Sequence, residues 1–114
     1  MIKRTPQNRG QRVLERPDGD IEVQDLQVDP LPSLVAGGGG TTVSASVGYS
    51  YQPFAVAKCS VHITLGCDQT TDTMDRAAHI ALRMAREYAL DGMETIREDV
   101  QSDRFHVPEE YRPS

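Results

Sequence analysis

The residue types best suited to metal chemistry lie together in one short stretch, KCSVHITLGC, at residues 58–67. Cys59, His62 and Cys67 have a C-x2-H-x4-C spacing, and His79 could supply a fourth ligand, as in a small zinc module. The stretch also alternates in the manner of a strand, which would turn both cysteines to one face and His62 to the other. Because the ligands would then point apart, we expect no bound metal and no cofactor.

The strand pattern also argues against a disulfide bond. Eight residues of strand would separate Cys59 from Cys67 by roughly 26 Å, whereas a disulfide needs Cα atoms within about 7 Å of each other. We therefore expect two buried free thiols among Val, Ile and Leu side chains. Unpaired cysteines are typical of a reducing compartment, so the sequence predicts a cytoplasmic protein.

Catalytic machinery is not indicated elsewhere in the chain. The serines lie in an alternating strand pattern or in the terminal segments, without the strand-turn-helix motif of a hydrolase nucleophile. The carboxylates fall on the predicted outer side of a helix or in an acidic segment, where a solvated surface is the ordinary explanation. We expect a protein that is not an enzyme and that takes no small-molecule substrate.

Length and composition favour one small domain. The chain has 114 residues, a net charge of −5 and 38% hydrophobic residues, with no tryptophan, which predicts a single thin core. No apolar run is long enough to span a bilayer, and the N-terminal residues continue into a polar stretch rather than the apolar core of a signal peptide. We expect no membrane partner.

The first forty residues predict an extended arm. Basic residues dominate residues 1–16, acidic residues dominate residues 17–29, and four prolines interrupt any helix. Residues 37–40 are glycines, which form a flexible connector or let the backbone pass tightly against a neighbour. Residues 1–40 are therefore assigned to an arm with a glycine joint. The alternative is that residues 21–28, IEVQDLQV, fold back over the rest of the chain as a third strand.

Residues 41–100 predict a ββα core domain, followed by a tail at residues 101–114. Apolar and small polar residues alternate from Thr42 to Tyr51, which is typical of a strand with one covered face. A second extended run from Phe54 to Leu65 completes an antiparallel β-hairpin. The predicted fold class is α+β, with this small hairpin packed on one long amphipathic C-terminal helix.

The helix is predicted to begin near Thr73, with Thr71, Asp72 or Thr73 as the N-cap. At about 100° per residue, one side of the helix is apolar and the other is charged. The apolar side contains Met74, Ala77, Ala78, Ile80, Ala81, Met84, Ala85, Tyr88, Met93 and Ile96. Gly92 falls within this apolar arc, where a missing side chain could let a neighbour approach closely.

The hairpin has an uncharged surface that predicts association. Lys58 and Asp68 are the only charged residues from Thr41 to Thr71, whereas natural sheets usually protect open edges with charges or covering elements. We expect the fold to be completed by oligomerisation, as a homo-oligomer or with an assembly partner protein. The predicted interaction residues are Val43, Val47, Tyr49, Tyr51, Val61, Ile63, Ile80, Met84 and Tyr88.

The stretch from VSASVGYSYQPF through VAKCSVHITLGCDQTTDTMDRA resembles small uncharacterised proteins of bacteriophages and other mobile elements. The likeness covers roughly residues 41–98 and consists of an alternating strand, a second strand and a capped amphipathic helix. It implies a phage or mobile-element setting and a non-catalytic role in assembly, DNA metabolism or host manipulation. For a phage-encoded chain the virion is then an alternative location to the cytoplasm.

Two functions remain open at this point. The first is a structural or interaction protein whose arms connect the ββα module to neighbouring subunits. The second is a single-stranded nucleic-acid-binding accessory protein, in which Tyr49, Tyr51 and Phe54 would stack on bases while basic residues neutralise phosphates. Its predicted phosphate contacts are Lys3, Arg4, Arg9, Arg12, Arg76, Arg83 and Arg86. The net negative charge and the apolar setting of Tyr49 favour the first.

Overall fold

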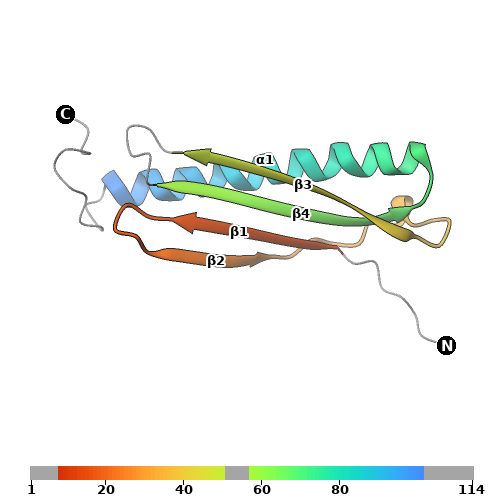
Figure 1. Ribbon diagram of the computed structural model, residues 1–114, viewed down its shortest axis with the longest axis horizontal. Helices are drawn as coiled ribbons and strands as arrows, with labels where there is room; N and C mark the ends of the chain where they lie inside the picture. Colours follow the sequence, from red (N-terminus) through yellow and green to blue (C-terminus); the bar gives the residue numbers. More distant parts are fainter. Residues whose placement is uncertain (1–7, 51–56, 102–114) are drawn as a thin grey trace.

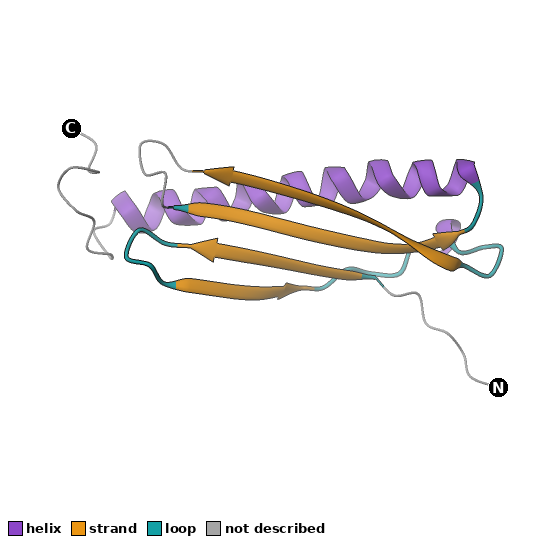
Figure 2. Ribbon diagram, in the orientation of Figure 1, coloured by secondary structure: helices purple, strands orange, loops and turns teal. Residues whose placement is uncertain are grey.

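The protein folds into two layers, a four-stranded antiparallel sheet and one long helix (Figure 1). The computed structural model describes residues 8–50 and 57–101. The strands are β1 (Arg9–Glu15), β2 (Ile21–Leu26), β3 (Gly40–Ser50) and β4 (Lys58–Asp68), and the helix is α1 (Thr71–Gln101). A short 3-10 helix, η1 (Pro32–Leu34), lies in the connection between β2 and β3 (Figure 2). The predicted α+β class is confirmed.

The predicted hairpin forms the outer half of the sheet. The strand order is β2-β1-β4-β3, and β3 pairs with β4 without a bulge from Gly40 opposite Asp68 to Ser50 opposite Lys58. Both strands of this hairpin have eleven residues. Because directly opposite residues share a face, the apolar residues of β3 and β4 all turn toward α1, while their small polar residues turn away from it.

The prediction of an extended N-terminal arm is wrong for residues 9–26. These residues form β1 and β2, and β1 pairs along its whole length with β4. The N-terminal segment therefore closes one side of the hairpin, and β2 is a further strand, although it pairs with β1 rather than with the hairpin itself. The assigned boundary at residue 40 runs through a single sheet. Residues 1–7 of the assigned arm lie outside the described residues.

The glycine joint at residues 37–40 is a hydrogen-bonded turn rather than a flexible connector. The carboxylate of Asp68 accepts hydrogen bonds from the N–H groups of Gly37 and Gly39, both at 2.7 Å. Gly38, Gly39 and Gly40 have φ angles of 102°, 76° and 112°, a region that side chains rarely allow. The loop that leads into β3 is thus fixed at the end of β4.

The helix begins at Thr71 and its N-cap is Thr70, whose hydroxyl oxygen lies 3.2 Å from the backbone nitrogen of Thr73, which donates to it. The predicted caps Thr71, Asp72 and Thr73 are wrong, because all three lie inside the helix and Thr70 Oγ1 accepts from the third residue beyond it in the usual capping geometry. The helix continues through Gly92 to Gln101. No helix in the described part of the chain is both long enough and apolar enough to cross a membrane.

The side of α1 that faces the sheet consists largely of alanines. Ala77, Ala81, Ala85 and Ala89 are fully buried at successive turns, and such small side chains let the helix axis lie close to the sheet. The opposing core side chains come from the two central strands and from η1. They are Leu14, Leu34, Cys59, Val61, Ile63, Leu65 and Cys67.

Candidate interaction surface

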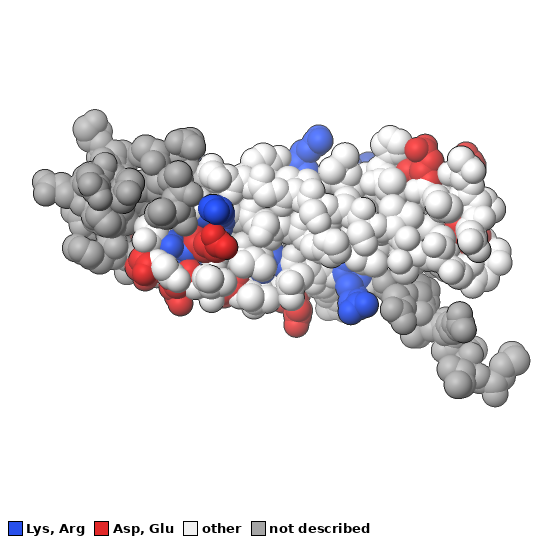
Figure 3. Space-filling view, in the orientation of Figure 1, with Lys and Arg blue, Asp and Glu red and all other residues white. Residues whose placement is uncertain are grey.

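One face of the sheet has no covering layer in the described structure. The helix α1 packs on β3 and β4 and reaches β1, all on the same side. Figure 1 shows β3 and β4 passing in front of α1, so the view looks onto the opposite side of the sheet. In the same view the middle of the molecule is almost free of charged atoms (Figure 3). The part of this face formed by residues 42–48 of β3 and by residues 60–64 of β4 therefore carries no Lys, Arg, Asp or Glu, while Arg9, Glu15, Asp25 and Lys58 lie around it.

Short polar side chains connect β3 to β4 across this neutral face. Ser46 Oγ lies 2.6 Å from His62 Nδ1, and Ser44 Oγ lies 2.9 Å from Thr64 Oγ1. The Ser46–His62 pair has the atom types of a catalytic dyad. However, the second ring nitrogen of His62 faces Thr64 Oγ1 at 3.3 Å rather than a carboxylate, and all of these contacts are exposed. We interpret the group as a cross-strand link, since such hydroxyl pairs stabilise antiparallel neighbours.

The two edges of the sheet differ in how they are protected. At one edge β2 has six residues, two of them the acidic Glu22 and Asp25. At the other edge β3 has eleven residues, none of them charged and none of them proline. Edge strands in natural proteins are usually short or carry charges, prolines or bulges, because a free edge accepts further strands. The β2 edge has this protection, whereas the β3 edge lacks it.

The helix carries two exposed leucines, and one of them lies beside this unprotected edge. Leu82 and Leu90 are 41% and 52% exposed. The side chain of Asp91 reaches Arg12 of β1 with a 3.5 Å ion pair, which fixes the flank of α1 that faces β1. At about 100° per residue, Leu82 lies opposite Asp91 around the helix axis. Leu82 therefore faces the free side of β3, while Leu90 points away from the sheet.

The predicted interaction residues divide into core and boundary positions. Val61 and Ile63 are 1% and 0% exposed in the central strand β4, so they belong to the core of the subunit. Six of the others are half-buried on β3 or α1 and pack against that core. They are Val43, Val47, Tyr49, Ile80, Met84 and Tyr88. Tyr51 lies outside the described residues.

The predicted nucleic-acid contacts do not form one surface. Arg9 is exposed on the uncovered face of the sheet, next to Thr64 of β4, whereas Arg76, Arg83 and Arg86 are exposed on α1 on the other side. Tyr49 faces the helix, as its pairing with the buried Cys59 shows. Lys3, Arg4, Tyr51 and Phe54 lie outside the described residues.

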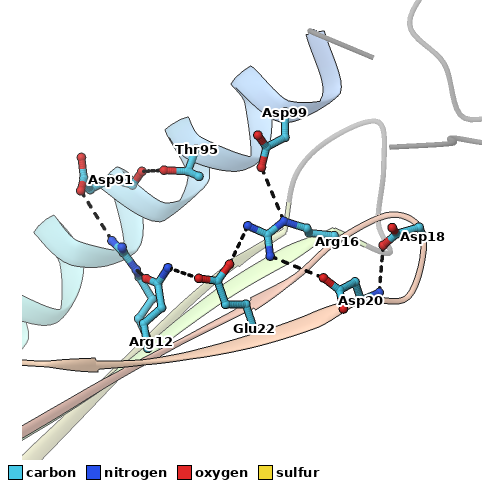
Figure 4. A network of polar contacts seen from close by, with 9 residues as sticks. Arg12, Arg16, Asp18, Asp20, Glu22, Asp91, Thr95 and Asp99 are labelled. Atoms are coloured by element: carbon cyan, nitrogen blue, oxygen red, sulfur yellow. Dashed lines mark hydrogen bonds and ion pairs between the residues drawn. The ribbon is translucent and has the colours of Figure 1, made fainter. Parts of the chain in front are cut away.

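Arg12 is not available for phosphate, because it belongs to a polar network between the sheet and the helix (Figure 4). Its guanidinium donates to Gln24 Oε1 at 2.7 Å and to the carbonyl oxygen of Tyr88 at 3.1 Å. Together with the ion pair to Asp91, these contacts occupy the side chain within the fold. The prediction that Arg12 binds nucleic acid is therefore wrong.

Arg16 forms the second half of the network. It pairs with Glu22 at 2.7 Å and with Asp99 of α1 at 3.5 Å. Burial alone would lower the pKa of Arg16, but the hydrogen bonds and charges of Glu22 and Asp99 outweigh it and raise that pKa. Hydrogen bonds from Gln24 and Arg16 lower the pKa of Glu22. The network attaches the β1–β2 hairpin to the C-terminal half of the helix.

Both cysteines are buried free thiols, as the strand pattern predicts. Burial raises the pKa of the Cys59 thiol and of the Cys67 thiol, so neither has the depressed value of a reactive cysteine. His79 is exposed on α1, where its ring lies 2.9 Å from the carbonyl oxygen of Asp75. Within the described residues, no three His, Cys, Asp or Glu side chains converge in a way that could hold a metal ion.

The sequence pattern did contain a signal for the helix flank. At about 100° per residue, Leu82 falls between Ile96 and Met93 at one border of the apolar arc, and Leu90 lies outside that arc. Comparisons with protein-family models, with curated proteins and with solved structures found no match.

Proposed function

We propose that this protein is a non-catalytic interaction module that associates with copies of itself through the edge of β3. The observation that supports this most directly is the unprotected edge of eleven uncharged residues. Each backbone group on a free edge can pair with another strand, and such pairing extends the sheet into the neighbouring subunit. A predicted place in a phage or mobile-element assembly is compatible with this role and remains part of the proposal.

The difference in length and charge between the two edge strands supports this role. The acidic, six-residue β2 strand is a poor partner for a further strand, while β3 is long, neutral and regular. Ser44 and Ser46 add only short side chains on the uncovered face, so an incoming strand meets neither bulk nor charge there. The buried thiols and the exposed hydroxyl–imidazole pair offer no comparable arrangement for catalysis.

The test is the mass of the full chain in solution by light scattering, together with a variant that places charges on the edge. We expect the unmodified chain to have at least twice the monomer mass. Ser44→Lys/Ser46→Lys should have the monomer mass, because like charges would lie across the seam. Circular dichroism of this variant should retain the mixed helix and strand signal.

The matched control is Ser44→Ala/Ser46→Ala, which removes the same two hydroxyl contacts without adding charge. This variant should keep the mass of the unmodified chain. A monomeric unmodified chain would contradict the proposal. So would an oligomer that persists in the lysine variant, because the edge of β3 would then not be the contact.

A further inference from the structure

We infer that the partner at this edge is a single second copy, placed by a two-fold axis through Ala45, with the two α1 helices side by side at Leu82. This inference rests on the proposed function and specifies its geometry. The result would be a closed dimer with one eight-stranded sheet.

The sequence of β3 is suited to antiparallel pairing with itself. A two-fold axis through Ala45 pairs all eleven residues of the strand, because Gly40 and Ser50 are equally distant from it. On the helix side this register sets Val43 opposite Val47 of the second copy. On the uncovered side it sets Ser44 opposite Ser46. Residues of matched size and type thus meet at the centre of the seam, whereas the outer pairs, such as Thr41 with Tyr49, combine residues of different size.

The position of α1 brings the two helices to packing distance. The helix lies over β3 and β4 alike, so its axis is about half a strand spacing from β3. Adding the spacing of about 4.8 Å between the paired β3 strands gives an interaxial distance of about 10 Å. Packed helices in proteins lie about 8–10 Å apart. The second helix would therefore contact the first directly.

The same geometry places Leu82 beside the two-fold axis. A Cβ atom on Gly92 would lie 2.4 Å from the Sγ atom of Cys59, so these two residues mark one level along the molecule. Ile63, which pairs with Ala45, is about 13 Å further along β4. On the returning helix this distance corresponds to about nine residues before Gly92, next to Leu82. The two copies of this exposed leucine would meet.

The remaining side chains on this flank are compatible with antiparallel helices. Met93, which is half-buried, lies on the same flank as Leu82, because it is also nearly opposite Asp91 around the helix axis. Asp75 and Arg86 lie within about 40° of this flank. They are on opposite sides of Leu82 in the sequence. A two-fold axis would therefore bring the arginine of each helix toward the aspartate end of the other.

The area of the contact matches that of a stable dimer. An edge of eleven residues is about 36 Å long, and the sheet and helix together are about 20 Å thick, which gives about 700 Å² for each copy. Standard protein interfaces bury about 800 Å² for each partner. The outer edges of the pair would both be β2, with Glu22 and Asp25. Association should stop at two copies because these edges are short and acidic.

The register is tested by disulfide formation between two single variants, Ser44→Cys and Ser46→Cys. Opposite residues in an antiparallel pair have Cα atoms about 5 Å apart, within reach of a disulfide, whereas the two Ser44 positions of the dimer would be about 8 Å apart. Oxidation by glutathione disulfide should give a covalent dimer only when both variants are mixed. The native cysteines do not interfere, since both are fully buried.

The helix contact is tested with Leu82→Glu, and Leu90→Glu is the matched control because it is exposed on the same helix but points away from the sheet. The first variant should weaken the dimer about tenfold or more, and the second should leave its dissociation constant unchanged. Equal effects of the two variants would remove the helix from the interface and overturn the inference.

Other outcomes separate this inference from the proposed function. Covalent dimers of either cysteine variant alone would move the axis away from Ala45, which overturns the inference while edge association stands. Masses above the dimer would refute closure in the same way. A monomeric chain overturns both proposals. If the β3 amides were protected from hydrogen exchange only after another protein is added, the edge would bind that different partner, and both proposals would again be overturned.

Discussion

Gly92 controls how closely α1 lies on the sheet. A Cβ atom at this position would be 2.4 Å from Cys59 Sγ and 3.1 Å from a carbon atom of Leu14. Glycine in the interior of a helix costs about 1 kcal/mol relative to alanine, so its presence in a regular 31-residue helix needs a reason. The close approach of the central strands supplies that reason.

At this residue scale we predict that Gly92→Ala destabilises the protein. The higher helix propensity of alanine favours the folded state, but the added methyl group overlaps Cys59 and forces α1 away from the sheet. Overpacking of this kind costs about 1–3 kcal/mol, so the free energy of unfolding should fall by about that amount less the propensity gain. Urea denaturation followed by circular dichroism measures the change.

The double variant Cys59→Ala/Gly92→Ala is the control for this mechanism. It removes the Sγ atom that the new methyl group would meet. We expect its free energy of unfolding to be higher than the sum of the two single changes predicts, because the residues are in contact. Additive effects would show that the cost of the alanine has another origin.

At the scale of elements, a polar network attaches the β1–β2 hairpin to α1. Arg16 pairs with Glu22 of β2 and with Asp99 near the end of the helix, and its side chain is only 11% exposed. In the described structure α1 packs on β3, β4 and β1. The arginines therefore hold the β1–β2 hairpin to the same helix that packs on β3 and β4.

We predict that Arg16→Ala loosens this attachment. Asp99, itself largely buried, would lose a charged partner, and the expected loss in the free energy of unfolding is about 2 kcal/mol. Hydrogen exchange should accelerate in β2 and in the last turns of α1 more than in β3 and β4. Arg83→Ala, at an exposed position of the same helix, should change stability by less than about 0.5 kcal/mol. Uniform acceleration along the chain would contradict this role for Arg16.

The same network explains what could and could not be predicted from the sequence. The β3–β4 hairpin and α1 follow from local periodicity, because each has one apolar side at a regular spacing. The strand β1 does not, and β2 follows only as the alternative third strand at residues 21–28, since the charged residues Arg12, Arg16 and Glu22 are read as solvated until their partners are known. Those partners are up to 83 residues away in the sequence, as for Arg16 and Asp99, and no local pattern encodes the pairing.

At the scale of the whole molecule, the expectation that oligomerisation completes the fold now applies to one edge of the sheet rather than to the whole hairpin. The N-terminal strands close one side of the hairpin, and among the described residues the β3 side has no neighbouring strand. The interface can therefore be placed on a particular strand and a particular helix flank. The uncovered face of the sheet is a separate surface, and pairing of two copies would double its neutral area without burying it.

Because the β3 edge is uncharged, the effect of salt on the dissociation constant of the oligomer tests whether association uses this edge. β3 has no charged residue, so screening should not weaken its pairing, and the dissociation constant should change less than about threefold between about 0.05 M and 0.5 M salt. Nucleic-acid binding through arginines would instead weaken steeply over that range, because each neutralised phosphate releases a counterion. Sedimentation equilibrium of the protein alone, and fluorescence anisotropy of a labelled single-stranded oligonucleotide, distinguish the two. An oligomer that dissociates steeply as salt rises would show that charged contacts, and not the neutral β3 edge, supply most of its stability, which would contradict the proposal.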